Sequence, residues 1–149
     1  MKSVFNPADN AEIIERINKL TPTTPALWGK MNAAQMLTHC QPFIRIAIGE
    51  LKLKRAFIGL IFGKMAKKKI LADGPLEKNM PTLPQAKITW DVDFEEEKAK
   101  LIELVARLPK LGYDGLINEP HPFFGKLTNQ EWDQLNTKHL DHHLSQFGV

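Results

Sequence analysis

Three of the five histidines in this chain lie close together in the segment "HLDHH" near its C-terminal end, at positions 139, 142 and 143. His139 and His143 are four residues apart, so on a helix their imidazoles lie on the same side, one turn apart. Two imidazoles in this arrangement can bind one divalent metal ion. Inward-facing histidines can also be ordinary core residues whose nitrogens are hydrogen-bonded, and the spacing alone leaves both interpretations open.

His39 has the same kind of surroundings in an earlier segment. At about 100° per residue, a helix places it on one face with apolar side chains, namely Met36, Phe43, Ile46 and Ala47. In the C-terminal segment, a sector of roughly 80° contains the residues Trp132, Leu135, His139, His143 and Gln146. If the two helices pack side by side, His39 can join His139 and His143 in a three-histidine site. Such a site leaves a tetrahedral ion one open position for water, as in catalytic zinc sites.

Two other histidines are candidates for handling protons. His142 lies about 100° round the helix from His143, at the margin of the site or on the surface. His121 lies between two prolines in "EPHPFFGKL", a loop that leads into the histidine helix. It could overhang the site as a proton donor or acceptor, or be an exposed residue before a buried aromatic anchor. Phe124 and Trp132 are expected to wall the pocket, and Gln146 to assist the ligands.

Several familiar chemistries are not supported. Leu140 stands where the metalloprotease motif H-E-x-x-H has its glutamate base, and no glutamate lies three residues before any histidine, as it does in di-iron carboxylate bundles. The sequence has no P-loop, no dinucleotide-binding G-x-G-x-x-G and no G-x-S-x-G. Cys40 is the only cysteine, which excludes an internal disulfide and a multi-cysteine zinc site. Histidine and carboxylate remain as metal ligands.

Helices must position these residues. Apolar periodicity and capping residues predict helices over about 9–20, 32–49, 55–71, 93–112 and 128–148. Asn32 with Gln35, and Thr128 with Glu131, have the spacing of capping boxes. Pro42 predicts a kink or local irregularity in the second helix. Residues 72–92 contain three prolines and predict a long loop, with one short extended piece at "KITWDV". The whole pattern predicts an all-α fold, a helical bundle.

The size and composition are those of one globular domain spanning residues 1–149. The chain is 43% hydrophobic and 25% charged, and no apolar stretch is long enough to span a membrane. The N-terminus lacks the apolar core of a signal peptide, so we expect a cytoplasmic protein.

The net charge of +3 is unevenly distributed. Residues 52–69 contain seven basic residues and no acidic one. This segment is either a solvated face or a surface for an anionic ligand, a lipid or a partner protein. Nucleic acid is a weak candidate, because no pattern of stacking aromatic residues accompanies the lysines.

The segments "LWGKMNAAQMLTHC" (27–40), "HPFFGKLT" and "WDQLNTKHLDHHLSQFG" (132–148) together resemble the DinB-like superfamily of metalloenzymes. More narrowly, they look like a small bacterial branch known mainly as an uncharacterised domain family. The resemblance extends from Trp28 onward and is least distinctive over 50–90. It implies a four-helix bundle with three histidines, at the positions of His39, His139 and His143, around a divalent metal. Zinc and nickel are the metals that it favours.

The resemblance also implies a glutamine three residues after the last histidine, which Gln146 matches. The residue before it is usually glycine in the superfamily, whereas this chain has Ser145. Some relatives activate a low-molecular-weight thiol such as bacillithiol or mycothiol. Homodimers are also expected on this ground.

Two functional hypotheses follow. The first is a metal-dependent enzyme, a hydrolase or a thiol transferase, that acts on a small-molecule substrate. The second is a non-catalytic helical bundle that binds an anionic ligand or partner through residues 52–69.

Overall fold

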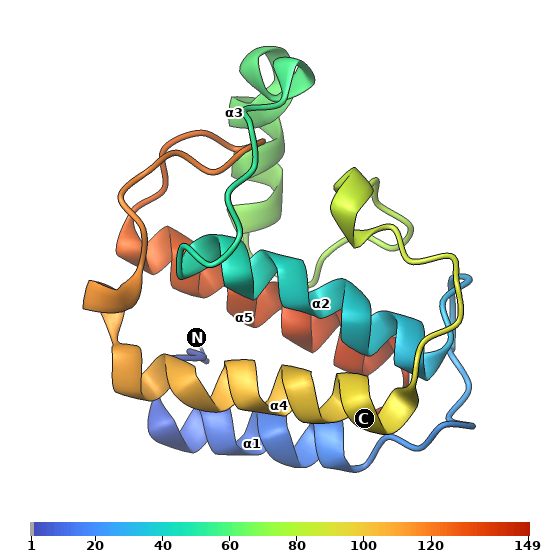
Figure 1. Ribbon diagram of the computed structural model, residues 1–149. Helices are drawn as coiled ribbons and strands as arrows, with labels where there is room; N and C mark the ends of the chain where they lie inside the picture. The colour runs from blue at the N-terminus through green and yellow to red at the C-terminus, as the bar shows by residue number, and fades with distance from the viewer. Residues whose placement is uncertain (1) are drawn as a thin grey trace.

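The computed structural model describes residues 2–149, which form five α-helices joined by loops (Figure 1). The helices are α1 (Pro7–Asn18), α2 (Ala33–Ala47), α3 (Phe57–Leu71), α4 (Phe94–Leu111) and α5 (Asn129–Gln146). Two short 3-10 turns, Pro84–Ala86 and Tyr113–Gly115, flank α4. Within the described residues no strand occurs, and the one β-type pairing is an isolated bridge between His121 and Gly125. None of the described helices is both long and apolar enough to cross a membrane.

All five predicted helices are confirmed, and their bounds differ from the predicted ones by at most two residues. The difference at α1 arises because the side chain of Asn6 accepts hydrogen bonds from the N–H groups of Ala8 and Asp9, so the helix begins at Pro7. Both predicted capping boxes are present. Pro42 lies inside α2. No strand forms at "KITWDV", which directly follows the short 3-10 turn that ends at the first buried residue of the loop, Ala86.

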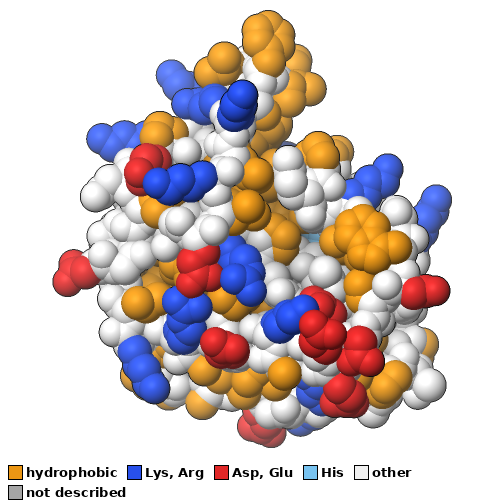
Figure 2. All heavy atoms as spheres, viewed as in Figure 1, with side chains coloured by type: hydrophobic (Ala, Val, Ile, Leu, Met, Phe, Trp, Pro, Cys, Tyr) orange, Lys and Arg blue, Asp and Glu red, His pale blue; other side chains and the backbone are white. Residues whose placement is uncertain are grey.

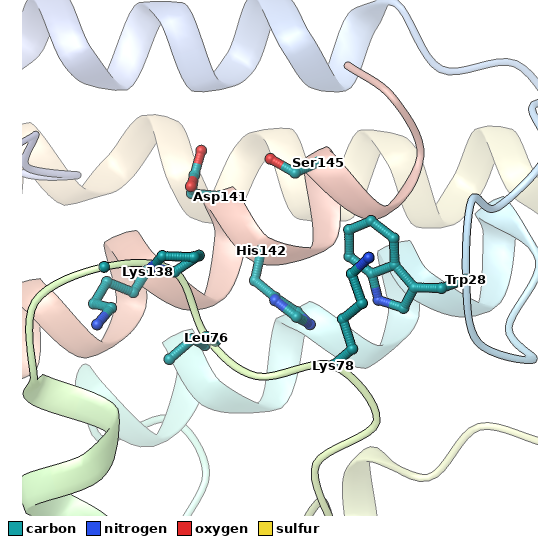
Figure 3. A pocket seen from close by; sticks show the side chains of 9 residues that line it. Trp28, Leu76, Lys78, Lys138, Asp141, His142 and Ser145 are labelled. Atoms are coloured by element: carbon teal, nitrogen blue, oxygen red, sulfur yellow. The ribbon is translucent and has the colours of Figure 1, made fainter.

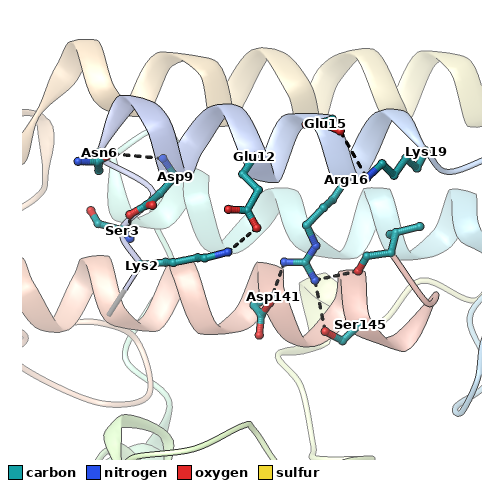
Figure 4. Close-up of polar contacts among 11 residues, drawn as sticks. Lys2, Ser3, Asn6, Asp9, Glu12, Glu15, Arg16, Lys19, Asp141 and Ser145 are labelled. Atoms are coloured by element: carbon teal, nitrogen blue, oxygen red, sulfur yellow. Dashed lines mark hydrogen bonds and ion pairs between the residues drawn. The ribbon is translucent and has the colours of Figure 1, made fainter.

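Four helices close around one core. α2 packs against α4 and α5, and α1 packs against the same two helices from the other side (Figure 1). Arg16 of α1 joins it to α5 through an ion pair with Asp141 at 2.7 Å and a hydrogen bond to the carbonyl oxygen of Val149 (Figure 4). The core that these helices enclose contains mainly aliphatic side chains, including Ile17, Leu37, Leu101 and Leu140. This packing brings the middle of α2 beside the second half of α5.

A proline inside α4 is matched by a side chain from α1. Pro109 has no N–H, so the carbonyl of Val105 lacks its helical partner. The buried amide of Asn10 donates to this carbonyl at 2.8 Å and to the carbonyl of Val4 at 2.7 Å. The contact satisfies a polar group that would otherwise be buried without a partner.

α3 is arranged differently from the other four helices, because it projects away from the core (Figure 1). Its C-terminal end is attached to α5 by side chains that serve as caps. Lys138 donates to the carbonyls of Ile70 and Ala72 at 2.8 and 2.6 Å, and Gln134 donates to the carbonyl of Leu71 at 2.8 Å. These bonds occupy carbonyls that the end of a helix leaves free.

Candidate metal centre

Three histidines meet where α2 and α5 face each other. α2 supplies His39, and α5 supplies His139 and His143 from successive turns. One ring nitrogen of each lies within 4.8 Å of the corresponding nitrogens of the other two. The ring centroids are 4.5 Å apart for His39 and His143, 4.7 Å for His139 and His143, and 5.1 Å for His39 and His139. The helical projection of the sequence selected the same three residues.

Hydrogen bonds orient two of these rings. Nδ1 of His39 lies 2.7 Å from the carbonyl oxygen of Ala86, and Nδ1 of His143 lies 2.8 Å from Oε1 of Gln146. Because both oxygens only accept, each Nδ1 carries the proton and each Nε2 presents a lone pair. Gln146 is itself fixed, since its Nε2 donates to the carbonyl of Trp28 at 2.7 Å. Histidine ligands of metals are held by outer partners of this kind.

The distance between His39 and His139 tests most directly whether a metal ion fits between the three histidines. Their Nε2 atoms face each other at 3.2 Å. Two nitrogens at this separation are stable when one of them carries a proton or when a cation lies between them. With Zn–N bonds of about 2.0–2.1 Å, two ligands of a tetrahedral ion are about 3.3 Å apart. The donor set and its spacing therefore fit a divalent ion.

Burial keeps these imidazoles neutral. His39 is 4% exposed and His143 is 8% exposed. Burial, reinforced by neighbouring histidines, lowers the pKa of His143 to about 3. Burial also lowers the pKa values of His39 and His139, and for His139 repulsion by His143 and His39 adds to the effect. All three are therefore neutral at pH 7, which is the form that coordinates metals.

Phe43 covers one side of the cluster. Its ring centroid lies 4.0 Å from that of His139 and 5.4 Å from that of His39. Four residues separate it from His39, so the helical period places it on the ligand face. An aromatic ring in this position limits the access of water to the Nε2 atoms of His39 and His139.

His142 lies beside the cluster and faces a pocket. Its ring is 5.0 Å from that of His143 and packs edge-on against Trp28 at 5.7 Å. Figure 3 shows His142 in a pocket of about 360 Å³, together with Lys78, whose ammonium group lies 4.3 Å from the centre of a Trp28 ring. Half-burial lowers the pKa of His142, although Asp141 opposes the shift. His142 is thus the one histidine placed between the cluster and an open cavity.

His121, Phe124 and Trp132 form a separate group. Nδ1 of His121 accepts the N–H groups of Phe123 and Phe124, at 3.0 and 3.2 Å, and its ring packs on Phe124 and Trp132. Trp132 is 1% exposed and lies on α5 two turns before His139, which is about 10 Å along the axis. The structure does not place these three residues around the histidine cluster. His121 is buried in its own loop, where it organises the "HPFF" turn.

Sequence reasoning missed the groups that hold the cluster from outside. The carbonyls of Ala86 and Trp28 belong to the long loop and to the segment before α2, and a backbone oxygen leaves no signal in a sequence. The helical projection placed Phe43 on the same face as His39, but it did not indicate that the ring of Phe43 covers the cluster. The spacing of four residues between His39 and Phe43 was the signal that could have indicated this role.

Comparison with known proteins assigns a family to the chain. No curated protein and no solved structure matches it. Residues 4–148 match one family model, whose description is a protein of unknown function (DUF1569). Because this match covers nearly the whole sequence, the chain belongs to the DUF1569 family.

Proposed function

We propose that His39, His139 and His143 bind one divalent metal ion and that the protein is a metal-dependent enzyme of the DinB-like superfamily. The observation that carries the proposal is the 3.2 Å approach of the Nε2 atoms of His39 and His139, with a ring nitrogen of His143 within 4.8 Å. The four helices that enclose one core are compatible with a DinB-like four-helix bundle in a single domain. Zinc and nickel are the favoured ions, since neutral imidazoles suit both.

The residues around the cluster support catalysis as well as binding. Three protein ligands leave a position for another molecule, and a divalent ion held there would supply Lewis-acid chemistry that activates a water or a thiol as nucleophile. His142 is positioned to hold or move a proton between the cluster and the pocket beside Trp28. We therefore propose a hydrolase or a transferase that uses a low-molecular-weight thiol, with the substrate entering this pocket.

Metal content of the untagged protein tests the proposal, since a histidine tag would bind metal itself. We expect about one equivalent of zinc or nickel per chain by plasma mass spectrometry. His139→Ala should lose it, because two imidazoles cannot hold the ion as three do. His142→Ala is the matched control on the same helix and should retain it.

Two results would contradict the proposal. One is a His139→Ala variant that folds, judged by circular dichroism, and still holds one equivalent of metal. The other is a wild-type protein that stays free of metal after incubation with zinc or nickel and desalting. If the metal assignment holds, turnover of thioester, amide and thiol-transfer substrates should disappear in His139→Ala.

A further inference from the structure

α3 exposes an unusual number of large apolar side chains. Six of them are between 47% and 76% exposed, namely Phe57, Ile58, Leu60, Ile61, Phe62 and Met65. Elsewhere among the described residues only Leu27, Trp90 and Tyr113 are exposed in this way, and they are scattered. A contiguous apolar surface of this kind marks an interaction site in a folded protein.

The side of α3 that faces the rest of the protein is formed by two glycines. Gly59 and Gly63 are one turn apart and lie against the backbone of Phe123, so close that an added Cβ would come within 2.6 and 2.2 Å of its carbonyl oxygen. The helix therefore touches the loop through its backbone. The apolar side chains are left on the other sides, over about 200° of arc at 100° per residue.

Positive charge is arranged below the apolar residues. Five of the six apolar side chains occupy the first six residues of α3, whereas its lysines begin at Lys64. Figure 2 shows this order, with apolar atoms at the tip of the projection and Lys and Arg side chains beneath them. Within residues 52–69, Lys67 and Lys69 form ion pairs with Glu131 and Glu77, while the lysines of this segment without an ion pair are Lys52, Lys54, Lys64 and Lys68.

The shape and charge of this projection favour a lipid surface over a protein partner. A helix that enters a protein groove presents one apolar stripe, whereas these residues surround most of the helix. A second copy of the chain would bring the same positive charge and be repelled. From Phe57 to Phe62 the helix rises about 7.5 Å, comparable with the roughly 5–10 Å to which peripheral helices enter the interface of a bilayer.

We propose that α3 docks the protein onto the surface of an anionic lipid bilayer. The apolar tip enters the interfacial region, and the lysines without ion pairs contact the phosphate and carboxylate groups of the lipids. With 15 residues, α3 attaches to one leaflet and does not span the bilayer. The proposal does not depend on the metal centre.

Co-sedimentation of the full chain with vesicles tests this docking. We expect binding to vesicles of phosphatidylcholine with 30% phosphatidylserine and much weaker binding to phosphatidylcholine alone. Because each lysine near an anionic surface contributes about fivefold to the partition coefficient, the double variant Lys64→Gln, Lys68→Gln should bind about 25-fold more weakly. Phe62→Ala should lose about tenfold or more through the missing apolar contact. Higher salt should weaken binding of the wild type.

The controls use exposed residues elsewhere. Lys30→Gln with Lys110→Gln removes the same charge, and Trp90→Ala removes an aromatic ring that is 55% exposed. Both variants should bind vesicles as the wild type does. His139→Ala should also bind normally, which separates this proposal from the metal assignment.

Three results would overturn the docking proposal. The first is a wild-type protein that stays in the supernatant with anionic vesicles. The second is binding that the α3 variants leave unchanged. The third is a concentration-dependent dimer, measured by analytical ultracentrifugation without lipid, that Phe62→Ala dissociates while vesicles have no effect. That last result would assign the apolar tip to a second copy.

Discussion

The Nδ1 atoms of the buried histidines have opposite roles. Nδ1 donates to an oxygen in His39 and His143, and it accepts two backbone N–H groups in His121. The proton of a neutral imidazole is therefore on Nδ1 in the first two and on Nε2 in the third. Only the first arrangement leaves Nε2 free to bind a metal. At this scale the sequence predicted which histidines share a face and that Gln146 assists them, but the oxygen that sets the tautomer of His39 comes from the distant Ala86.

Removal of the outer partner of His143 should weaken metal binding without abolishing it. In Gln146→Leu, Nδ1 of His143 loses its acceptor and the ring loses its fixed orientation. We expect metal affinity to fall about 10–100-fold, measured by competition with a chromophoric chelator. Gln130→Leu changes an exposed glutamine in the first turn of α5, far from the cluster, and it should leave the affinity unchanged. An equal loss of affinity in Gln146→Leu and Gln130→Leu would contradict a specific role for Gln146.

His121 should make stability depend on pH. Burial lowers its pKa to about 4, from the ordinary value of 6.5. The unfolded chain therefore binds a proton that the folded chain does not, and the free energy of unfolding falls as the pH drops from 6.5 towards 4. For one group this loss reaches about 3 kcal/mol at pH 4 and about 2 kcal/mol at pH 5.

The variant His121→Asn isolates this effect. An asparagine oxygen can accept the same two N–H groups but does not titrate. We expect the decrease in unfolding free energy between pH 7 and pH 5, measured by urea denaturation of the metal-free protein, to be about 2 kcal/mol smaller in the variant. Identical pH dependence of the two proteins would show that His121 is not buried in its neutral form.

Four of the five helices were predictable because each begins at a residue whose side chain caps it, whereas α3 has no such capping side chain. Asn32 with Gln35, and Thr128 with Glu131, form the capping boxes that their spacing predicts. The long connection before α4 was predicted as a loop, but its path was not, because it is fixed by tertiary contacts such as the bond from His39 to Ala86. The fit between Asn10 and Pro109 is likewise invisible in the sequence, where 99 positions separate the two residues.

The contact between α1 and the proline of α4 can be measured as a coupling. Asn10→Ala leaves the carbonyl of Val105 buried without a partner, so the free energy of unfolding should fall by about 1–3 kcal/mol. In a Pro109→Ala background, residue 109 regains an N–H for this carbonyl, and the same change at Asn10 should cost less. Urea denaturation of the four proteins gives the coupling energy. A coupling near zero would contradict this account.

At the scale of the whole molecule, the candidate centre connects segments that are a hundred residues apart. Metal should therefore stabilise the folded chain against an unfolded chain that lacks the site. At a free metal concentration about 1,000 times the dissociation constant, the gain is about 4 kcal/mol, or about 10 °C in Tm for a domain of this size. Calorimetry with and without zinc checks this, and His139→Ala should show no increase. A similar increase in both proteins would indicate binding elsewhere.

The sequence predicted an all-helical molecule but not the projection of α3. The apolar residues of "AFIGLIFG" have the composition of a core segment, and periodicity does not distinguish a buried helix from one that exposes its apolar sides. The close approach of Gly59 and Gly63 to the backbone of Phe123 decides the outcome, because it leaves the larger side chains facing outward. This information resides in the tertiary structure.

The capping of α3 by α5 has a mechanical consequence. Lys138 holds the last carbonyls of α3 and is the residue immediately before His139. α5 thus carries, at two adjacent residues, a contact that holds the end of α3 and a histidine of the cluster. A displacement of α3 that is transmitted through Lys138 should alter the ligand geometry, so the absorption spectrum of cobalt bound at the three histidines would be an optical reporter of what α3 touches.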